Sequence, residues 1–394
     1  MRKIRLAVFN TQPPHLYFGG VERRIVEIAK ALSNEVQTSV FSGTKKGFRE
    51  ATRIGETNVV PCLSTDSFFP LDNWTFNRTI SGMVGAVKAD VFEGHAVSAY
   101  GVLRSLKKRD LSSRFIQTIH GVLADEYMLS SLSESQNPRV KLANMFMWRL
   151  SRLERELAQN SGIIVTVSKY SVRKILTYYG VEESKIRIVP NGVDCERFRP
   201  RVGSEELKRQ LGLTNNRAVL FVGRLIPRKG LNYLVEAAEQ IVKEADNVKF
   251  VIAGDGPMRD SLVAWLKRLE ILDKFIFLGD VSDAMLPELY NCADIFALPS
   301  IQEGQGIALL EAQASGKPVV AFNVGAVSES IMEGQTGFLY EPNSQRLSSS
   351  LLRLLADAPL REKMGAKGRE FVCDNYSWAL CSRKMCQVYS EISS

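Results

Sequence analysis

The sequence has few of the residues that hold metal ions or build disulfide frameworks. It contains three histidines and six cysteines, and the cysteines are scattered without a Cys-x-x-Cys pair or a histidine cluster beside them. Zinc sites and small disulfide scaffolds need closely spaced groups of such residues. We therefore expect no metal site, and we expect all six cysteines to be reduced and structural.

Long apolar runs are also missing. No segment approaches the ~18 apolar residues that a membrane-spanning helix needs. The apolar part of the opening segment, Met-Arg-Lys-Ile-Arg-Leu-Ala-Val-Phe-Asn, is too short for a secretory signal peptide. These absences predict a soluble, cytoplasmic protein.

The length and the charge distribution predict two domains with different surfaces. The chain has 394 residues, more than the roughly 250–300 that one hydrophobic core serves. Residues 1–196 hold 27 Lys and Arg against 19 Asp and Glu, whereas residues 197–394 hold 24 of each. The net charge of +8 therefore lies in the N-terminal half. A basic half indicates an anionic partner, such as a membrane surface or a phosphorylated acceptor; a merely soluble surface is the alternative.

Short apolar runs alternate with helical patterns through the first half, which is typical of a parallel, doubly wound α/β sheet. The expected strands are residues 4–10, 36–41, 90–93, 115–119, 162–167 and 186–189. Gly19-Gly20 follows the first run and precedes a helix, but it is not a Gly-x-Gly-x-x-Gly fingerprint, so it is either an anion site or a plain tight turn. His120 follows the run 115–119, where such sheets place chemistry; a structural histidine is the alternative.

Two basic segments stand apart in this half. Residues 104–109 are a compact basic cluster, and residues 139–158 form a probable helix that mixes basic with apolar side chains. Such segments suit a peripheral contact with an anionic membrane, and a helix buried on one face gives the same pattern.

A second alternation follows the polar stretch 201–216, which we expect to be the interdomain hinge. The expected strands are residues 218–222, 248–253, 275–278, 295–298 and 319–322, and each runs into Gly, Pro or small polar residues. Because backbone approaches a ligand closely at such residues, this sheet edge is predicted to form a nucleotide-type pocket. Arg224 and Lys229, in the first of these loops, suit the binding of a leaving diphosphate.

Glu303 and Glu311 are the two carboxylates of the segment Glu-Gly-Gln-Gly-Ile-Ala-Leu-Leu-Glu, which follows the run 295–298. Glu303 lies in a glycine-rich loop and Glu311 in the helix after it, so both can face one cleft at a helix N-terminus. Carboxylates in that position suit the binding of sugar hydroxyls.

Seven motifs in this order resemble the retaining glycosyltransferases of family 4, which have the GT-B fold. They are Gly19-Gly20, His120-Gly121, Val167-Ser168, Pro-Asn-Gly-Val-Asp at 190–194, Val-Gly-Arg-Leu at 222–225 with Lys229-Gly230, Gly-Asp-Gly-Pro at 254–257, and the Glu303 to Glu311 segment. The resemblance covers about residues 4–340. It implies two Rossmann-like domains that face a cleft: an acceptor-side domain of residues 1–197, on which a helix of about residues 376–394 packs back, and a donor-binding domain of residues 198–375.

The resemblance also implies site residues. Arg224 and Lys229 are implied to bind the diphosphate, Glu311 the ribose, and Glu303 the donor sugar. His120 is implied to contact that sugar near the reacting carbon. The further implied donor and nucleotide contacts are Gly19, Gly20, Gly254, Gly256, Gly279, Val281, Gly304, Gln305, Gly306 and Ile307. Two positions depart from the family pattern. The family commonly has an aromatic residue or proline where this chain has Gln305, and a second glycine where it has Ala326. The departure at Gln305 leaves the identity of the donor sugar open.

The implied reaction is transfer of a hexose-type sugar from a UDP- or GDP-linked donor to a lipid-linked or oligosaccharide acceptor in glycoconjugate assembly. It proceeds by front-face substitution with retention and without a protein nucleophile, so the paired glutamates do not act as in a glycosidase. No cofactor or metal is expected, because Arg224 and Lys229 supply the positive charge. Nucleic acid is not an expected partner. A nucleotide-sugar epimerase or hydrolase and a non-catalytic binding subunit are the alternatives, and acceptor contacts are expected from the loops at 43–51 and 66–78.

Overall fold

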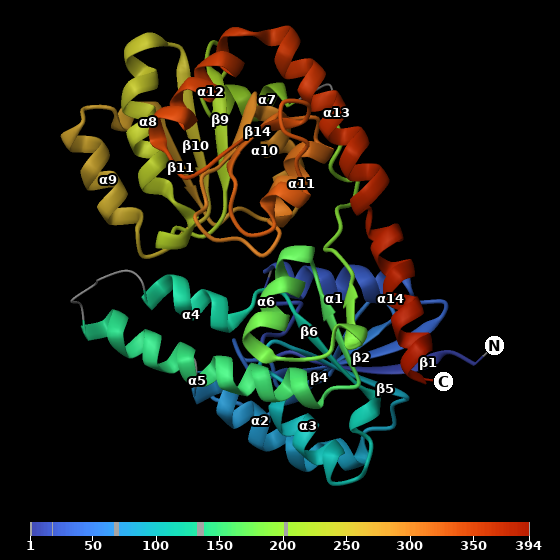
Figure 1. Ribbon diagram of the computed structural model, residues 1–394. Helices are drawn as coiled ribbons and strands as arrows, with labels where there is room; N and C mark the ends of the chain where they lie inside the picture. The colour runs from blue at the N-terminus through green and yellow to red at the C-terminus, as the bar shows by residue number, and fades with distance from the viewer. Residues whose placement is uncertain (1, 18, 67–70, 132–137, 201–203, 394) are drawn as a thin grey trace. The chain divides into compact units, whose positions relative to one another are not determined.

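The structure, a computed structural model, describes residues 2–17, 19–66, 71–131, 138–200 and 204–393 (Figure 1). In the range 138–200, side chains are described only from Asn144 onward. The chain divides into two compact units. Unit 1 comprises Met1–Asn191 and Trp378–Ser394, and unit 2 comprises Gly192–Ser377. The chain first passes from unit 1 to unit 2 between Asn191 and Gly192. The domain boundary was predicted a few residues later, after residue 197. Each unit is built on one mainly parallel sheet, which confirms the predicted α/β class.

Unit 1 contains an eight-stranded sheet in the order β3-β4-β2-β1-β5-β6-β7-β8. Its strands are β1 (Ile4–Phe9), β2 (Val36–Gly43), β3 (Thr52–Ile54), β4 (Thr57–Cys62), β5 (Val91–His95), β6 (Phe115–Ile119), β7 (Ile163–Thr166) and β8 (Ile186–Ile188). All pairs are parallel except β3 with β4, which form an antiparallel edge. In the centre, Val8 of β1 lies opposite Val40 of β2. The six predicted strands are all present, and the short edge strand β3 and its neighbour β4 were not predicted.

Helices cover both faces of this sheet (Figure 1). The helices of unit 1 are α1 (Gly20–Ala31), α2 (Leu71–Met83), α3 (Tyr100–Lys107), α4 (Leu123–Ser131), α5 (Pro138–Asn160), α6 (Lys169–Tyr179) and α14 (Trp378–Ser393). On one face, α1 and the C-terminal helix α14 share a core through Ile25, Ile28, Met385 and Val388. On the other face, Phe76 of α2, Val102 of α3 and Leu157 of α5 pack against the strands. The apolar residues of each strand thus alternate between two cores.

A buried cation fixes the end of unit 1 before the chain crosses to unit 2. Arg24 of α1 has no exposed surface. Its Nη1 donates to the carbonyl oxygens of Val189 and Pro190, both at 2.9 Å, and to Asn191 Oδ1 at 3.3 Å. A buried guanidinium needs such acceptors, because an unpaired buried charge is strongly destabilising. The Pro190-Asn191 motif therefore has a structural task in holding α1.

Unit 2 contains a six-stranded, fully parallel sheet in the order β11-β10-β9-β12-β13-β14. Its strands are β9 (Arg217–Val222), β10 (Val248–Ala253), β11 (Phe275–Gly279), β12 (Ile295–Leu298), β13 (Val319–Phe322) and β14 (Gly337–Tyr340). The order reverses between β9 and β12, which is the topological switch point where such sheets bind ligands. The five predicted strands are present, and β14 was not predicted.

The helices of unit 2 also form two layers. They are α7 (Glu205–Gln210), α8 (Leu231–Glu244), α9 (Arg259–Arg268), α10 (Leu286–Cys292), α11 (Ile307–Ala314), α12 (Ser344–Ala356) and α13 (Ala358–Tyr376). Leu234 of α8 and Leu351 of α12 lie in the core on one face, and Leu310 of α11 with Val372 of α13 in the core on the other. A side chain caps the N-terminus of α12: Asn343 Oδ1 accepts a hydrogen bond from the backbone amide of Arg346 at 2.9 Å.

Two expected loops differ in the structure. The stretch 201–216, expected as a hinge, includes α7, whose Leu207 is buried in the core of unit 2; residues 201–203 lie outside the described residues. The segment 66–78, expected as a variable loop, includes the first half of α2, and residues 67–70 also lie outside the description. In both cases apolar residues at helical spacing outweigh a polar composition.

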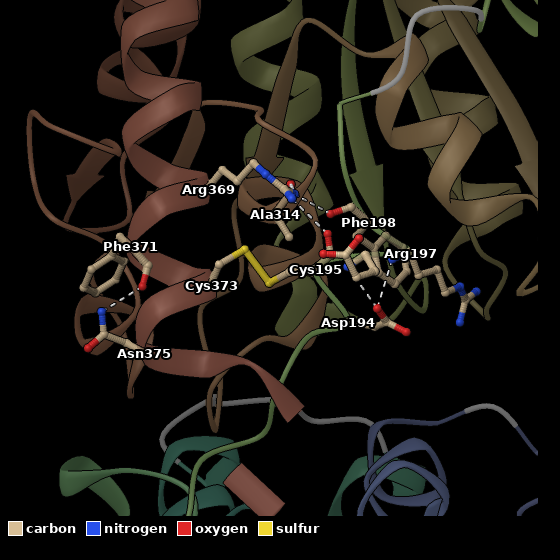
Figure 2. The surroundings of a disulfide bond; sticks show 10 residues. Asp194, Cys195, Arg197, Phe198, Ala314, Arg369, Phe371, Cys373 and Asn375 are labelled. Carbon is tan, nitrogen blue, oxygen red and sulfur yellow. Dashed lines mark hydrogen bonds between the residues drawn. A yellow bond between two sulfur atoms is a disulfide. The ribbon is translucent and has the colours of Figure 1, made fainter. Parts of the chain in front are cut away.

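One cysteine expectation is wrong. Cys195 and Cys373 form a disulfide that joins the segment after Asp194 to the last turn of α13 (Figure 2). Arg369 of α13 reinforces this junction, because its guanidinium donates to the carbonyl oxygens of Cys195, at 3.0 Å, and Phe198, at 2.9 Å. The sequence hid this pair because 178 residues separate its members. The other four cysteines are free, as expected.

Membrane-spanning helices are not found in the described part of the chain, where every helix is too short or too polar to cross a bilayer.

We expect the disulfide to be detectable by non-reducing peptide mapping of protein purified without reductant. A Cys195→Ser variant should lose about 2–4 kcal/mol of stability, because a long loop is no longer closed in the unfolded chain. Cys386→Ser, at a free and partly exposed cysteine, is the matched control. Complete alkylation of Cys195 and Cys373 in the native, non-reduced protein would contradict the pairing.

Candidate active site

The carboxyl ends of β9, β10 and β11 meet in one hydrogen-bonded set of glycine loops in unit 2. The Gly254 amide donates to the Gly279 carbonyl oxygen at 2.7 Å, and the Leu225 amide donates to the Asp255 carbonyl oxygen at 2.9 Å. A Cβ atom on Gly254 would lie 2.1 Å from the Gly223 carbonyl oxygen, and one on Gly256 would lie 2.5 Å from that of Leu225. The predicted base-contact glycines are therefore brought together with the Gly223 to Leu225 loop, and the close contact requires residues without side chains.

Lys229 and Glu303 form an ion pair at the centre of this edge. Lys229 lies in the 3-10 turn η4 (Pro227–Lys229) after β9, and Glu303 in the loop after β12. The Lys229 ammonium donates to Glu303 Oε1, and the Ser300 hydroxyl donates to the same oxygen at 3.0 Å. The two side chains are 15% and 7% exposed. Burial acts to raise the pKa of Glu303, but the charges of Lys229 and Arg228 outweigh it and lower the pKa, so Glu303 is ionised.

Two glycines set the geometry of this ion pair. Gly230, directly after Lys229, has a φ of +65°, and a Cβ there would lie 1.9 Å from the Pro299 carbonyl oxygen. Gly325 has a φ of +57°, and a Cβ there would lie 1.9 Å from the Glu303 carbonyl oxygen. Only glycine meets both conditions at once. Ala326, the departure from the family pattern, has a φ of −101°, so its methyl group causes no backbone strain.

Glu311 is buried one helical turn into α11 and is 3% exposed. The Tyr290 hydroxyl donates to its Oε2 at 2.9 Å. Gly306, with a φ of +83°, precedes the first residue of α11, and Gln305 beside it is 4% exposed. Gly304 to Ile307 therefore form a tight, half-buried approach to a helix N-terminus, where backbone N–H groups favour anions and oxygen ligands.

Arg224 differs from Lys229 because it is exposed. No carboxylate within the described ranges forms an ion pair with it. An anionic ligand would therefore displace no ion pair of Arg224 within the described residues.

The corresponding edge of unit 1 carries Gly19 and Gly20. Gly20 is the first residue of α1, and Gly19 precedes it in an extended conformation. The Glu22 carboxylate lies at this helix N-terminus: its Oε1 accepts from Asn10 Nδ2 at 2.9 Å, and burial raises its pKa. A Cβ on Gly19 would lie 2.3 Å from Glu22 Oε2. Binding of a phosphate by Gly19 and Gly20 stays a prediction, and it requires this carboxylate to be neutral or to move.

His120, which is half-buried, ends a chain of otherwise buried polar groups in unit 1. Its Nε2 lies 2.9 Å from Nδ1 of His95, at the end of β5. His95 Nε2 lies 3.6 Å from Glu93 Oε1, and Glu93 also accepts hydrogen bonds from Thr118 Oγ1 and from the Tyr389 hydroxyl of α14, both at 2.6 Å. Burial lowers the pKa of His95 to about 3 and that of His120 well below its usual value. One imidazole must therefore donate to the other as a neutral pair.

The structure brings together Lys229 with Glu303, and the loop after β9 with the loops after β10 and β11. Gly19, Gly20 and His120 lie in unit 1, so their contact with the same donor stays a prediction, as do the assigned roles of the other site residues. In the described residues, His, Cys, Asp and Glu side chains form no group of three or more suited to a metal ion.

Sequence reasoning missed several partners. His95 ends a strand as His120 does, so the Glu-Gly-His sequence at 93–95 carried a usable signal. Ser300, three residues before Glu303, was also readable as a local partner. Tyr290 and Tyr389 had no local signal, because each meets its glutamate only through tertiary packing.

The neutral histidine pair predicts a pH dependence. Because an exposed histidine takes up a proton near pH ~6.5, the contribution of the buried pair to stability is complete above that pH and declines as the pH falls toward 3. Glu93, whose pKa is raised by burial, acts in the opposite direction, and the nearby Arg24 disfavours a second positive charge. We therefore expect the ring signals of His95 and His120 in NMR spectra to stay constant between pH 8 and 5. His95→Gln assigns the signals, and protonation of either ring near pH 6.5 would contradict the pairing.

Two family models together match most of the chain. Residues 18–197 match the family model described as Glycosyltransferase Family 4, and residues 203–371 match Glycosyl transferases group 1. An uncharacterized glycosyltransferase of Methanocaldococcus jannaschii is 34% identical over 57% of this chain and 59% of its own. A GDP-mannose-dependent alpha-(1-6)-phosphatidylinositol monomannoside mannosyltransferase of Mycobacterium tuberculosis is 32% identical over 59% of this chain and 62% of its own. The chain thus matches about three fifths of the length of these relatives.

The solved structure of a sucrose-phosphate synthase from Thermosynechococcus elongatus superimposes with a TM-score of 0.84 over 99% of each chain at 19% identity, which shows a shared fold. The predicted GT-B class is confirmed by this likeness and by the two sheets. From its two matched regions and its fold, the chain belongs to the family 4 glycosyltransferases.

Proposed function

We propose that the protein transfers a hexose from a UDP- or GDP-linked donor to a lipid-linked or oligosaccharide acceptor, with retention of anomeric configuration. The observation that carries the proposal is the buried Lys229–Glu303 pair among glycine loops at the switch point of unit 2. The name of the mycobacterial relative, which includes a nucleotide sugar and a phosphoinositide acceptor, supports the donor and acceptor classes.

Lys229 and Arg224 act on the leaving group. As the bond between the anomeric carbon and the diphosphate oxygen breaks, negative charge grows on the diphosphate. An ammonium and a guanidinium stabilise that charge most when they are already in place before the reaction. Lys229 is fixed by Glu303, whereas Arg224 is exposed and reaches the diphosphate by side-chain rotation.

Glu303 acts on the sugar. Its carboxylate is ionised and held by Lys229 and Ser300, so it accepts hydrogen bonds from donor hydroxyls without moving. The acceptor hydroxyl forms the new bond to the anomeric carbon on the face that the diphosphate leaves, and its proton passes to a diphosphate oxygen. The protein therefore supplies positioning and charge, with no covalent intermediate on a side chain.

Glu311 acts on the nucleoside. Its carboxylate is oriented by the Tyr290 hydroxyl, and it accepts from the ribose hydroxyls. Glu303 and Glu311 are thus separated in function: one recognises the sugar and the other the nucleotide.

This separation gives a binding test with nucleotide sugars and free nucleotides. We expect Glu303→Gln to weaken binding of the cognate UDP- or GDP-sugar by about 10- to 100-fold, the cost of about 1.5–3 kcal/mol for a lost charged hydrogen bond. Binding of free UDP or GDP should change little. Calorimetric titration of both ligands measures the difference, and equal losses for both would contradict the assignment of Glu303.

Glu311→Gln should weaken the free nucleotide and the nucleotide sugar by the same factor, because the lost contact is to the ribose. Tyr290→Phe should weaken both less, since it removes only the group that orients the carboxylate. Undiminished nucleotide binding by Glu311→Gln would refute the ribose contact.

Lys229→Met should abolish turnover and weaken both ligands, because the diphosphate loses its fixed cation and Glu303 is left buried without its partner. Lys243→Met is the matched control: Lys243 pairs with Glu239 at 3.2 Å on the exposed face of α8, so its loss should leave activity unchanged. Full activity of Lys229→Met would remove the central element of the proposal.

A further inference from the structure

An apolar groove of about 550 Å³ lies between α2, α3 and α5 in unit 1. Its lining comprises Leu71, Trp74, Tyr100, Phe146, Leu150 and Leu153, with Asn73, Asn77 and Arg149 as its polar members. Trp74 is 58% exposed and Leu71 41%. A volume of this size, lined by apolar and aromatic side chains with few polar groups, is typical of small-ligand sites. Exposed large apolar side chains such as Trp74 and Leu71 beside such a groove indicate an interaction site.

The charge around this groove is positive. Arg149 lines it, and the guanidinium groups of Arg78 and Arg104 lie over the rings of Trp74 and Tyr100, at 5.8 and 5.9 Å from their centroids. Within the described ranges, these three arginines form no ion pair with a carboxylate. The carboxylates nearby are already engaged: Glu156 accepts the Tyr100 hydroxyl at 2.9 Å, and Asp72 is paired with Lys45. An anionic group beside an apolar chain is therefore the complementary ligand.

The polar end of the groove is connected to the edge of the sheet that carries His95 and His120. Asn73 Oδ1 accepts a hydrogen bond from the Thr11 hydroxyl at 3.0 Å, in the segment that follows β1. The Thr11 hydroxyl also lies 2.9 Å from Ser98 Oγ, and the Ser98 amide donates to the His95 carbonyl oxygen at 3.1 Å. A molecule in the groove therefore has its polar end directed to the carboxyl ends of β1 and β5.

We propose that this groove binds the hydrocarbon chain of a lipid-phosphate acceptor, with its phosphate held by the surrounding arginines. The inference rests on the proposed function and specifies its acceptor class, in which the sugar-accepting hydroxyl lies at the sheet edge and the chain lies between α2 and α5. A second copy of this protein is a poor occupant, because it would bring the same positive charge to the groove, and the N-terminal half already carries the whole net charge of +8.

Alkyl phosphates of 4, 8 and 12 carbons, used below their micelle-forming concentrations, test the proposal by isothermal titration calorimetry. We expect one site per chain and an affinity that rises about fourfold for each additional buried methylene group. Dodecyltrimethylammonium has the same chain with the opposite charge, and it should bind at least tenfold more weakly. Affinity that does not depend on chain length, or equal binding of the cationic amphiphile, would overturn the proposal.

A pair of variants locates the site. Trp74→Glu places a negative charge in the groove and should weaken dodecyl phosphate at least tenfold. Ile188→Glu makes the same change at a 38% exposed apolar residue of β8, outside the groove, and should have no effect. Arg149→Glu, at another exposed position, repeats the test if Trp74→Glu does not fold. Unchanged affinity in a folded groove variant would overturn the assignment, as would dimerisation that Trp74→Glu abolishes without any binding of alkyl phosphate.

Donor binding separates this inference from the proposed function. UDP or GDP binding depends on loops of unit 2, so Trp74→Glu should leave it unchanged. Nucleotide binding without chain-length-dependent binding of alkyl phosphates would reject the groove and retain the donor site.

Discussion

The buried ion pair between Lys229 and Glu303 is the interaction on which the donor site depends. Two charges that are 15% and 7% exposed are tolerated only when they neutralise each other and their remaining polar atoms find partners. The fold provides this by packing Gly230 against Pro299 and Gly325 against Glu303, which leaves no room for a side chain. In the function we propose, a bound donor exchanges some of these contacts for its own diphosphate and hydroxyl oxygens, so charges that the fold already holds in place are oriented for the reaction.

Unit 1 follows the same physical rule with different groups. Arg24 is fully buried, and its Nη1 donates to the carbonyl oxygens of residues 189–190, whereas its Nε has no partner in the described part of the chain. Glu93 accepts hydrogen bonds from Thr118 and Tyr389. Because Tyr389 belongs to the C-terminal helix α14, the last residues of the chain contribute to the surroundings of the His95–His120 pair. The helix α14 thus contributes, besides its core side chains, a hydroxyl that holds the Glu93 carboxylate, which lies 3.6 Å from His95.

The sequence predicts the fold well because strands and strand ends leave local signals. Every predicted strand is present. The missed strands β3 and β14 are short and lie at sheet edges, where periodicity is weak, whereas β4 lies inside the sheet and was also missed. The segment at α2 and the helix α7 were expected as loops, since their polar residues outnumber their few buried apolar ones. Glu303, Lys229 and the glycines were predicted as site residues because each lies in a loop that directly follows a predicted strand. Their partners Tyr290 and Tyr389, and the Cys195–Cys373 pair, depend on contacts between distant segments that no spacing reveals.

The central claim is that this family 4 chain transfers the sugar with retention, using charge and positioning in place of a protein nucleophile. The most direct test is the anomeric configuration of the product, measured from the coupling constant of its anomeric proton by NMR. The donor is a nucleotide α-hexose, and the acceptor is a sugar linked to an alkyl phosphate. The account predicts an α-linked product. A β-linked product, or free hexose released at the same rate with and without acceptor, would contradict it.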